Sequence, residues 1–205
     1  MARRRRKPGV VFESQIARKT VEDQGSDAFC KTFTVSPELL GDVASKIFIR
    51  FAVPSDAPRL ISDGVIAGRP PARETWPQRV ELWLAEQQAG RRIVLVAEDA
   101  GGLLGSVQLV FAFPKGYNDP EAANGADIAM MEGLRLRAKA PAEVGNELVH
   151  EVQTLARKRS VKTLTFCLPM TENRALLQAK QWGFEEFRIM AEKDKMLCFF
   201  RKAIE

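Results

Sequence analysis

The sequence predicts an α/β protein with a mixed, mostly antiparallel sheet and helices on both faces. From residue 47 onward, apolar periodicities of two and of 3.6 residues alternate in the order β-α-α-β-β-β-α-β-α-β-β. The stretch Glu-Asp-Ala-Gly-Gly at 98–102 joins two apolar runs in the manner of a hairpin turn. The β-α-β-α run before the last strands resembles a crossover unit, which requires one parallel strand pair.

Each element has its own local signal. Ile47, Ile49 and Phe51 share one face of the first strand, which Pro54 ends, and Ser55 is a suitable N-cap for the helix that follows. The helices at 74–88 and 144–159 carry apolar stripes at helical spacing, and Gly90 ends the first of them. In chain order, we expect a strand at 47–54, helices at 55–66 and 74–88, strands at 92–97, 103–112 and 127–137, a helix at 144–159, a strand at 161–168, a helix at 171–181, and strands at 184–189 and 196–201.

Composition limits the class of protein. The 205 residues, 45% of them hydrophobic, suffice for one domain with an extension and a real core. No apolar run approaches the ~20 residues that span a bilayer, so we expect a cytoplasmic protein. Cys30, Cys167 and Cys198 are far apart and His150 is the only histidine, so we expect no metal site and small buried cysteines.

Positive charge is concentrated at the N-terminus. Residues 1–19 carry a net charge of +6, and the rest of the chain sums to −1. We therefore divide the chain into a basic arm and extension at 1–46, with one short helix from Ser36, and a domain at 47–205. Nucleic acid or another acidic partner is expected to bind the arm, although a solvated tail that aids solubility would look the same. The clustered cations are Arg3, Arg4, Arg5, Arg6 and Lys7.

Three stretches, in this order, resemble the GNAT superfamily of acyl-CoA N-acyltransferases. Residues 131–136 are similar to the family's fourth strand, and 144–148 to the turn and helix start that hold the CoA diphosphate. Residues 174–186 are similar to the helix that ends in Gly-Phe before the sixth strand. The match covers about three quarters of the chain and leaves out 1–46. It implies the GNAT fold, acetyl-CoA as cofactor and acetyl transfer to an amine.

The resemblance also implies where the cofactor lies. In the family, acyl-CoA occupies a gap between the fourth and fifth strands, and its diphosphate meets backbone N–H groups at a helix N-terminus. Here, Val144 and Gly145 would supply those N–H groups with Lys139 beside them, and Leu134 and Leu136 would line the gap. The loop at 64–73 would shape the acceptor site.

The turn departs from the family pattern Arg/Gln-x-x-Gly-x-Gly/Ala at 140–145. Only Gly145 fits, because Ala140 and Glu143 replace the cationic or amide residue and the first glycine. A carboxylate ~4 Å from a phosphate costs about 4 kcal/mol at an effective dielectric near 20. Alternatively, Glu143 in a first helical turn stabilises that helix by ~0.3–1 kcal/mol and occupies the anion site itself.

Proton chemistry is the second test. Amine acetylation needs a base for the ammonium and an acid for the departing thiolate. Glu132 is the best candidate base, on a face shared with Met130, Leu134 and Leu136 if pairing is regular; alternatively it is an acid at a bulge that faces water. Ala179 stands where many family members have a tyrosine as the acid, and Tyr117, the only tyrosine, lies in a loop.

Two functions therefore compete. The first is an acyl-CoA-dependent N-acyltransferase that these departures would impair. The second is an inactive GNAT-fold component of a larger assembly, such as a virion or a ribonucleoprotein particle, as some bacteriophage proteins look to be. A sequence-specific DNA binder is disfavoured, because no reading element accompanies the arm.

Overall fold

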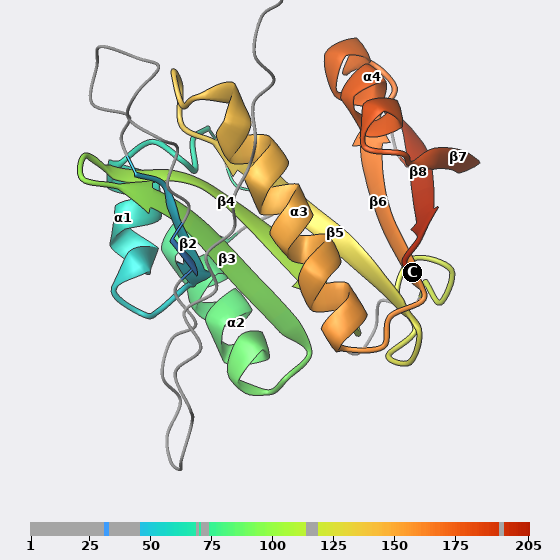
Figure 1. Ribbon diagram of the computed structural model, residues 1–205, viewed down its shortest axis with the longest axis horizontal. Helices are drawn as coiled ribbons and strands as arrows, with labels where there is room; N and C mark the ends of the chain where they lie inside the picture. Colours follow the sequence, from blue (N-terminus) through green and yellow to red (C-terminus); the bar gives the residue numbers. More distant parts are fainter. Residues whose placement is uncertain (1–30, 33–45, 69, 71–73, 114–118, 193–194) are drawn as a thin grey trace, which may run out of the picture.

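The computed structural model describes residues 31–32, 46–68, 70, 74–113, 119–192 and 195–205. Figure 1 shows these residues as a single sheet with helices packed against it. The expected short helix from Ser36, the arm cations, Cys30 and Tyr117 lie outside this range. The elements are β1 (Lys31–Thr32), β2 (Phe48–Phe51), α1 (Asp56–Ser62), α2 (Trp76–Gln88), β3 (Arg92–Asp99), β4 (Gly102–Val110), β5 (Ile128–Leu136), α3 (Ala142–Lys158), β6 (Thr163–Pro169), α4 (Asn173–Gln181), β7 (Glu185–Glu192) and β8 (Lys195–Ala203).

The strands form one sheet in the order β1-β2-β3-β4-β5-β6-β8-β7. Every neighbouring pair is antiparallel except β5 and β6, which α3 connects as the crossover unit expected from the sequence. The mixed, mostly antiparallel sheet is thereby confirmed. β1 was not predicted: its two residues pair with Ile49 and Phe48 and lie before the expected boundary at residue 46.

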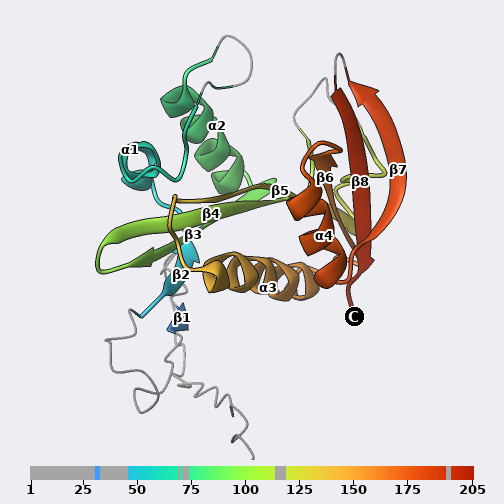
Figure 2. The same cartoon turned by 90° about the horizontal axis from the view of Figure 1, so that it is seen from above.

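Helices cover both faces of the sheet, as expected. Leu60 of α1 and Val80 of α2 pack with Val94 and Val96 of β3 in one apolar cluster. On the opposite face, α3 buries an apolar stripe centred on Leu148 against β3, β4 and β5. Figure 2 shows the sheet between α1 and α2 on one side and α3 on the other.

Helix α4 joins the α3 side through small and aromatic side chains. Ala179 is fully buried in the same cluster as the α3 stripe. Phe184, directly after Gly183, packs edge-on against Phe166 with ring centroids 4.7 Å apart. The Trp182 Nε1–H donates to the Asn146 side chain of α3 at 2.9 Å. These contacts give the Gly-Phe motif a packing role at the end of α4.

The two helices on the other face begin differently. Thr75 forms a complete capping box with Gln78 at the start of α2. Ser55 precedes α1, but its side chain makes no capping hydrogen bond, so the expected cap is absent. The Asp56 carboxylate accepts the Val53 N–H at 2.9 Å instead, which ties the end of β2 to the first turn of α1.

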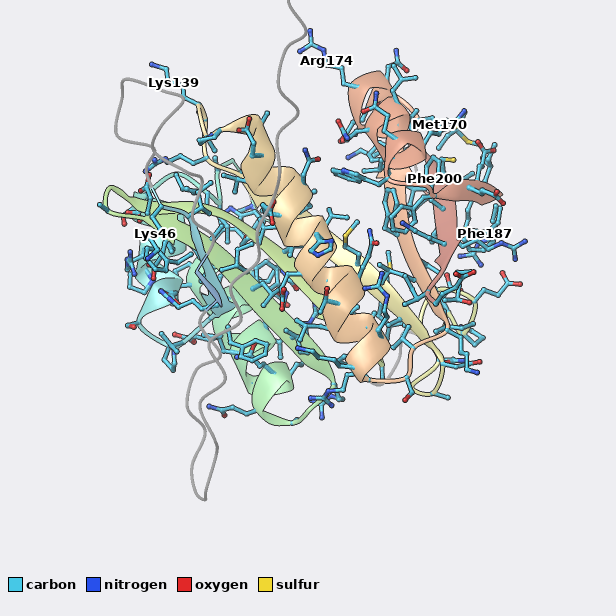
Figure 3. The ribbon with its side chains drawn as sticks, in the orientation of Figure 1. Lys46, Lys139, Met170, Arg174, Phe187 and Phe200 are labelled. Carbon is cyan, nitrogen blue, oxygen red and sulfur yellow. The ribbon has the colours of Figure 1, made fainter. Side chains whose placement is uncertain are left out.

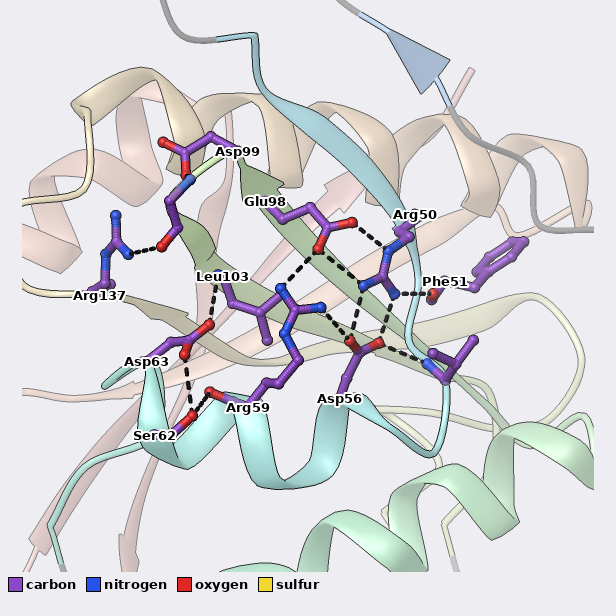
Figure 4. Close-up of polar contacts among 12 residues, drawn as sticks. Arg50, Phe51, Asp56, Arg59, Ser62, Asp63, Glu98, Asp99, Leu103 and Arg137 are labelled. Carbon is purple, nitrogen blue, oxygen red and sulfur yellow. Dashed lines mark hydrogen bonds and ion pairs between the residues drawn. The ribbon is translucent and has the colours of Figure 1, made fainter.

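A buried ion cluster fixes α1 to the sheet, as Figure 4 shows. Arg50 of β2 donates to Asp56 at 2.6 and 2.8 Å and to Glu98 of β3 at 2.8 and 3.1 Å. Arg59 adds a contact to each carboxylate. Burial raises the pKa of Asp56, but hydrogen bonds from Arg50 and Val53 outweigh burial and hold that pKa below its usual value.

Within the described residues, no helix is long and apolar enough to cross a bilayer.

Candidate active site

Strands β5 and β6 pair over only three residues. Ile128, Ala129 and Met130 align with residues 163–165 in parallel register, and no further pair forms. β5 nevertheless continues to Leu136, and β6 to Pro169. Figure 1 shows the strands moving apart beyond that point. The remaining backbone N–H and C=O groups that face this divergence have no ladder partner across it, so polar groups line the place where the resemblance put the cofactor.

A β-bulge at Gly133 determines which β5 side chains face which helices. Gln108 of β4 aligns with Glu132 and Ser106 aligns with Arg135, so residues 133 and 134 together oppose one residue of β4. Gly133 has φ 61°, and a Cβ there would lie 3.1 Å from the Gln108 side chain. Glycine therefore suits this position both in conformation and in space.

The bulge corrects the expected surroundings of Glu132. Leu134 belongs to the α3 side of the sheet, and Leu136 contacts Gly145 of α3. Glu132 instead lies on the face that α2 covers, because pairing is irregular. Its carboxylate accepts the Arg92 Nη1–H at 2.8 Å, and its side chain is 40% exposed. Glu132 is therefore an acid beside a bulge, ion-paired and still reachable by solvent, and not in an apolar setting.

Arg92 organises a polar cluster beneath α2 that sequence reasoning missed. Its guanidinium donates to Glu86 of α2 at 2.7 Å, to the Gln108 side-chain oxygen and to Glu132. Arg92, Glu86 and Gln108 are almost fully buried. Gln108 is the residue that could have indicated this cluster, since it is a long polar side chain in a strand that is apolar apart from Ser106. The members of this polar cluster are Glu86, Arg92, Gln108, Glu132 and Arg135.

Arg135 connects this cluster to the predicted acceptor loop. Its guanidinium lies over the Trp76 ring of α2, 5.0 Å from the centroid. The Trp76 Nε1–H donates to the carbonyl of Gly68 at 2.8 Å, within the loop that was expected to shape the acceptor site. Burial lowers the pKa of Arg135, and the nearby Arg79 lowers it further, whereas Glu132 raises it. The predicted loop and the polar cluster thus meet at Trp76.

The start of α3 lies at the end of β5, on the other face. The Ala140 N–H donates to Arg137 O at 2.9 Å and closes a turn in which Lys139 has φ 69°. Pro141 precedes the helix and supplies no side-chain cap, so no capping side chain occupies the N–H groups of the first turn. Figure 3 shows Lys139 by the start of α3 and Arg174 on α4 at the same end of the molecule.

Of the other predicted cofactor residues, Val144 and Gly145 are buried in the first turn of α3, two and three residues after the helix start at Ala142. Glu143 is exposed in that turn and makes no side-chain hydrogen bond to the described part of the chain. Close packing brings the helix to the strand end: a Cβ on Gly145 would lie 3.4 Å from Leu136 Cδ1. The five predicted cofactor residues therefore gather around one corner between β5 and α3.

Two further side chains bear on proton transfer. Ala179 is fully buried in the apolar core and has no hydroxyl that could donate a proton. Cys167 lies on β6, and burial, reinforced by Glu132, Glu192 and Asp119, raises the pKa of its thiol to about 11. The thiol therefore stays protonated at neutral pH and is a poor nucleophile.

No group of three or more His, Cys, Asp or Glu side chains that could hold a metal ion occurs among the described residues.

Comparison with known proteins is informative only at the level of structure. No protein-family model and no curated protein matches the chain. A ribosomal-protein-alanine N-acetyltransferase from Brucella melitensis superposes with a TM-score of 0.59 at 21% identity, over 76% of this chain and 98% of its own.

Two further solved structures agree with this result. An N-acetyltransferase from Staphylococcus aureus gives a TM-score of 0.61 at 15% identity, covering 78% of this chain and 99% of its own. A Salmonella typhimurium protein, described as an acetyltransferase and solved with its cofactor acetyl-CoA, gives 0.60 at 16% identity, covering 78% and 94%. Together with the sheet order, the β5–β6 divergence and the crossover helix, these likenesses establish that the chain has the fold of the GNAT superfamily.

Proposed function

We propose that this protein is an acyl-CoA-dependent N-acyltransferase that transfers an acetyl group to an amine. The observation that carries the proposal is the arrangement around the β5–β6 divergence. The uncapped start of α3 lies on one side of β5, and the polar cluster with Glu132 lies on the other. A cofactor and an acceptor could therefore approach the same strand from opposite faces.

The residues at the corner of β5 and α3 suit acetyl-CoA. The N–H groups at the start of α3 would meet the diphosphate, because uncapped donors and the helix dipole favour anions. Val144 and Gly145 belong to this turn, but the Val144 N–H already donates to the Pro141 carbonyl at 3.1 Å, so the free donors are those of Ala142 and Glu143. Lys139 would add a positive charge, and Leu134 and Leu136 would flank the pantetheine arm. When bound, acetyl-CoA would supply a thioester carbonyl as the acyl donor.

Glu132 is the candidate base of this scheme. Its carboxylate would take the proton from the acceptor ammonium, and the free amine would then attack the thioester carbonyl as the carbon–sulfur bond breaks. Arg92 holds the carboxylate in place while sharing its own charge with Glu86. Because Ala179 has no hydroxyl and the Cys167 thiol is mostly buried, solvent would supply the proton for the departing thiolate.

Titration calorimetry with acetyl-CoA tests the cofactor step. We expect a micromolar dissociation constant for the wild type. Glu143→Gly is expected to bind more tightly, because it removes a carboxylate from the anion site. Glu147→Gln, one helical turn further along α3, is the matched control and should change affinity little. No detectable heat at millimolar acetyl-CoA, for the wild type and Glu143→Gly alike, would contradict the proposal.

The second candidate is a catalytically inactive GNAT-fold component of a larger assembly. It is favoured by Ala179, which has no hydroxyl where the resemblance would put the acid, and by the exposed Glu143 carboxylate in the turn where the diphosphate would bind. The basic residues Arg3 to Lys7 would then bind nucleic acid or another acidic partner. Thiol release from acetyl-CoA in the presence of amines separates the two candidates, since only the enzyme produces free CoA.

A further inference from the structure

We propose that the acceptor is an amine that also carries a carboxylate, such as a free amino acid, and that Arg135 binds this carboxylate. The inference rests on the proposed function, because it names the acceptor for the same site. Its basis is that Arg135, in the polar cluster, has no carboxylate partner among the described residues.

Arg135 is half-buried and lacks the carboxylate partners that the half-buried Arg50 and the buried Arg92 have. Arg50 contacts Asp56 and Glu98, and Arg92 contacts Glu86 and Glu132. Arg135 makes no ion pair with any residue that the structure describes, and its Nε is buried without a hydrogen-bond partner. A partly desolvated guanidinium whose buried Nε–H has no acceptor costs free energy that a bound anion would recover.

The carboxylate nearest along the strand does not fill this role. Glu132 lies three residues from Arg135, but its carboxylate is bound to Arg92 at 2.8 Å. Arg135 is instead held against the Trp76 ring, which the Gly68 carbonyl fixes from the loop side. A guanidinium restrained by stacking loses little freedom when it forms two parallel hydrogen bonds to a carboxylate.

Geometry relates the two charges to one small molecule. Because of the bulge at Gly133, Glu132 and Arg135 lie on the same face of β5. They pair with Gln108 and Ser106 of β4, which are two residues apart, so the two side chains are neighbours on that face. A ligand ammonium at Glu132 and a ligand carboxylate at Arg135 would therefore be a few bonds apart. Amino acids have this spacing, and polyamines have the wrong charge for Arg135 and the adjacent Arg79.

Matched acceptors test the inference on the full-length protein. Thiol release from acetyl-CoA would be measured with leucine, phenylalanine and glutamate, each beside its carboxamide and its decarboxylated amine. We expect kcat/KM to favour the free amino acid by about tenfold to a hundredfold, the range for a charge-assisted hydrogen bond. Spermidine, as a polycationic amine, is expected to be a poor acceptor.

Two substitutions assign that preference to Arg135. Arg135→Gln should abolish it by raising KM for the amino acid, with kcat and the acetyl-CoA dissociation constant little changed. Arg135→Lys should restore part of it, because the charge remains while the paired geometry is lost. Arg157→Gln, which removes the same charge at the far end of α3, is the control. Thermal melting of each variant would report whether it folds.

Every outcome bears on the inference. Three outcomes would overturn the inference and leave the acyltransferase proposal intact. They are equal activity on amines without a carboxylate, a preference that survives Arg135→Gln, and acetylation of a peptide N-terminus while free amino acids are inert. If no amine is acetylated, the proposed function fails, and ligand-observed NMR of the same acceptor sets decides the inference alone. Amino-acid binding that Arg135→Gln weakens would support it; absent or unchanged binding would overturn it.

Discussion

At the scale of single residues, two acids on the side of the sheet that α1 and α2 cover have different surroundings. Asp56 is buried with two arginines in contact, whereas Glu132 is ion-paired to one arginine and 40% exposed. The first arrangement leaves no room for a ligand. The second keeps a carboxylate oxygen accessible, and accessibility is what a base requires. Substitution of each acid should therefore affect a different property.

For Glu132, we expect a loss of turnover with little loss of stability. Glu132→Gln keeps the shape and a hydrogen-bond acceptor for Arg92 but cannot take a proton, so kcat should fall by roughly a hundredfold or more. Calorimetry should show nearly unchanged acetyl-CoA affinity. Glu185→Gln, an exposed acid on β7, is the control for the loss of one negative charge. Unchanged kcat would remove Glu132 from the mechanism.

For Asp56, we expect a loss of stability. Asp56→Asn leaves Arg50 buried with one carboxylate instead of two, and breaking a buried pair costs on the order of 3–5 kcal/mol. Glu74→Gln, at the surface pair with Arg79, should cost less than about 1 kcal/mol. Urea titrations of both variants at neutral pH would measure the difference. Equal midpoints would show that the ion cluster is not stabilising.

The same cluster should make stability sensitive to acid. In the ion cluster, hydrogen bonds from Arg50 lower the pKa of Glu98, and the pKa of Asp56 is lowered too. Outside the cluster, the Leu103 N–H lowers the pKa of Asp63. A carboxyl whose pKa is lowered in the folded state stabilises the protein when the pH is above its unfolded-state pKa, about 4. This stabilisation is lost as the pH falls through the folded-state pKa. Melting temperature should therefore decline below about pH 4, and Asp56→Asn should flatten that decline.

At the scale of elements, close packing fixes α3 to the strand ends. A Cβ at Gly105 of β4 would lie 2.7 Å from Leu136 Cδ2 and 3.0 Å from Arg135 O. We expect Gly105→Ala to cost ~1–3 kcal/mol through this overlap. Gly145→Ala, with its nearest contact at 3.4 Å, should be close to neutral, since alanine suits a helix interior. Chemical denaturation of both variants would compare them, and equal costs would contradict the packing argument.

Periodicity predicted every helix and strand from residue 48 onward, because apolar alternation reports directly which face is buried. It could not predict the two-residue β1, which has no pattern of its own and exists only through pairing with β2. Ser55 shows another limit: its backbone is already helical, and the N–H groups of Asp56 and Ala57 donate to the Val53 and Pro54 carbonyls, so its side chain caps nothing.

The candidate site was predictable in part, and again for physical reasons. Residues around the start of α3 are contiguous in sequence, so their clustering could be anticipated from a motif. The polar cluster draws on α2, β3, β4 and β5, and its contacts exist only once the sheet has formed. The sequence left two settings open for Glu132, and the structure matches the acid at a bulge: pairing is irregular, and one inserted residue in β5 places Leu134 and Leu136 on the other face.

At the scale of the whole molecule, charge separates the arm from the rest of the chain. Residues 1–19 hold the entire positive excess, so they should dominate electrostatic binding to nucleic acid. Engagement of Arg3 to Lys7 with phosphates of duplex DNA would give a log–log salt slope of about −4. Removal of residues 1–19 should abolish this binding while thermal melting stays the same.

Fluorescence anisotropy with labelled duplexes over a salt series would measure that slope. Binding by the truncated protein with equal affinity and slope would show that the arm is not the binding segment. Acetyl transfer that survives truncation would favour an enzyme with a localising tail. Loss of assembly into a particle, with no activity in either form, would favour the structural component.

The extra residue in β5 has a consequence for deletion variants. Without Gly133, Leu134 would oppose Val107 directly, and the side chains at 132, 134, 135 and 136 would keep the faces they now occupy. The pattern of buried and polar positions therefore does not require the insertion. What the insertion supplies is curvature, because a bulge bends its strand and increases local twist. A chain lacking Gly133 should fold around the same core with a straighter β5, extend its ladder with β6 beyond three pairs, and bind acetyl-CoA poorly.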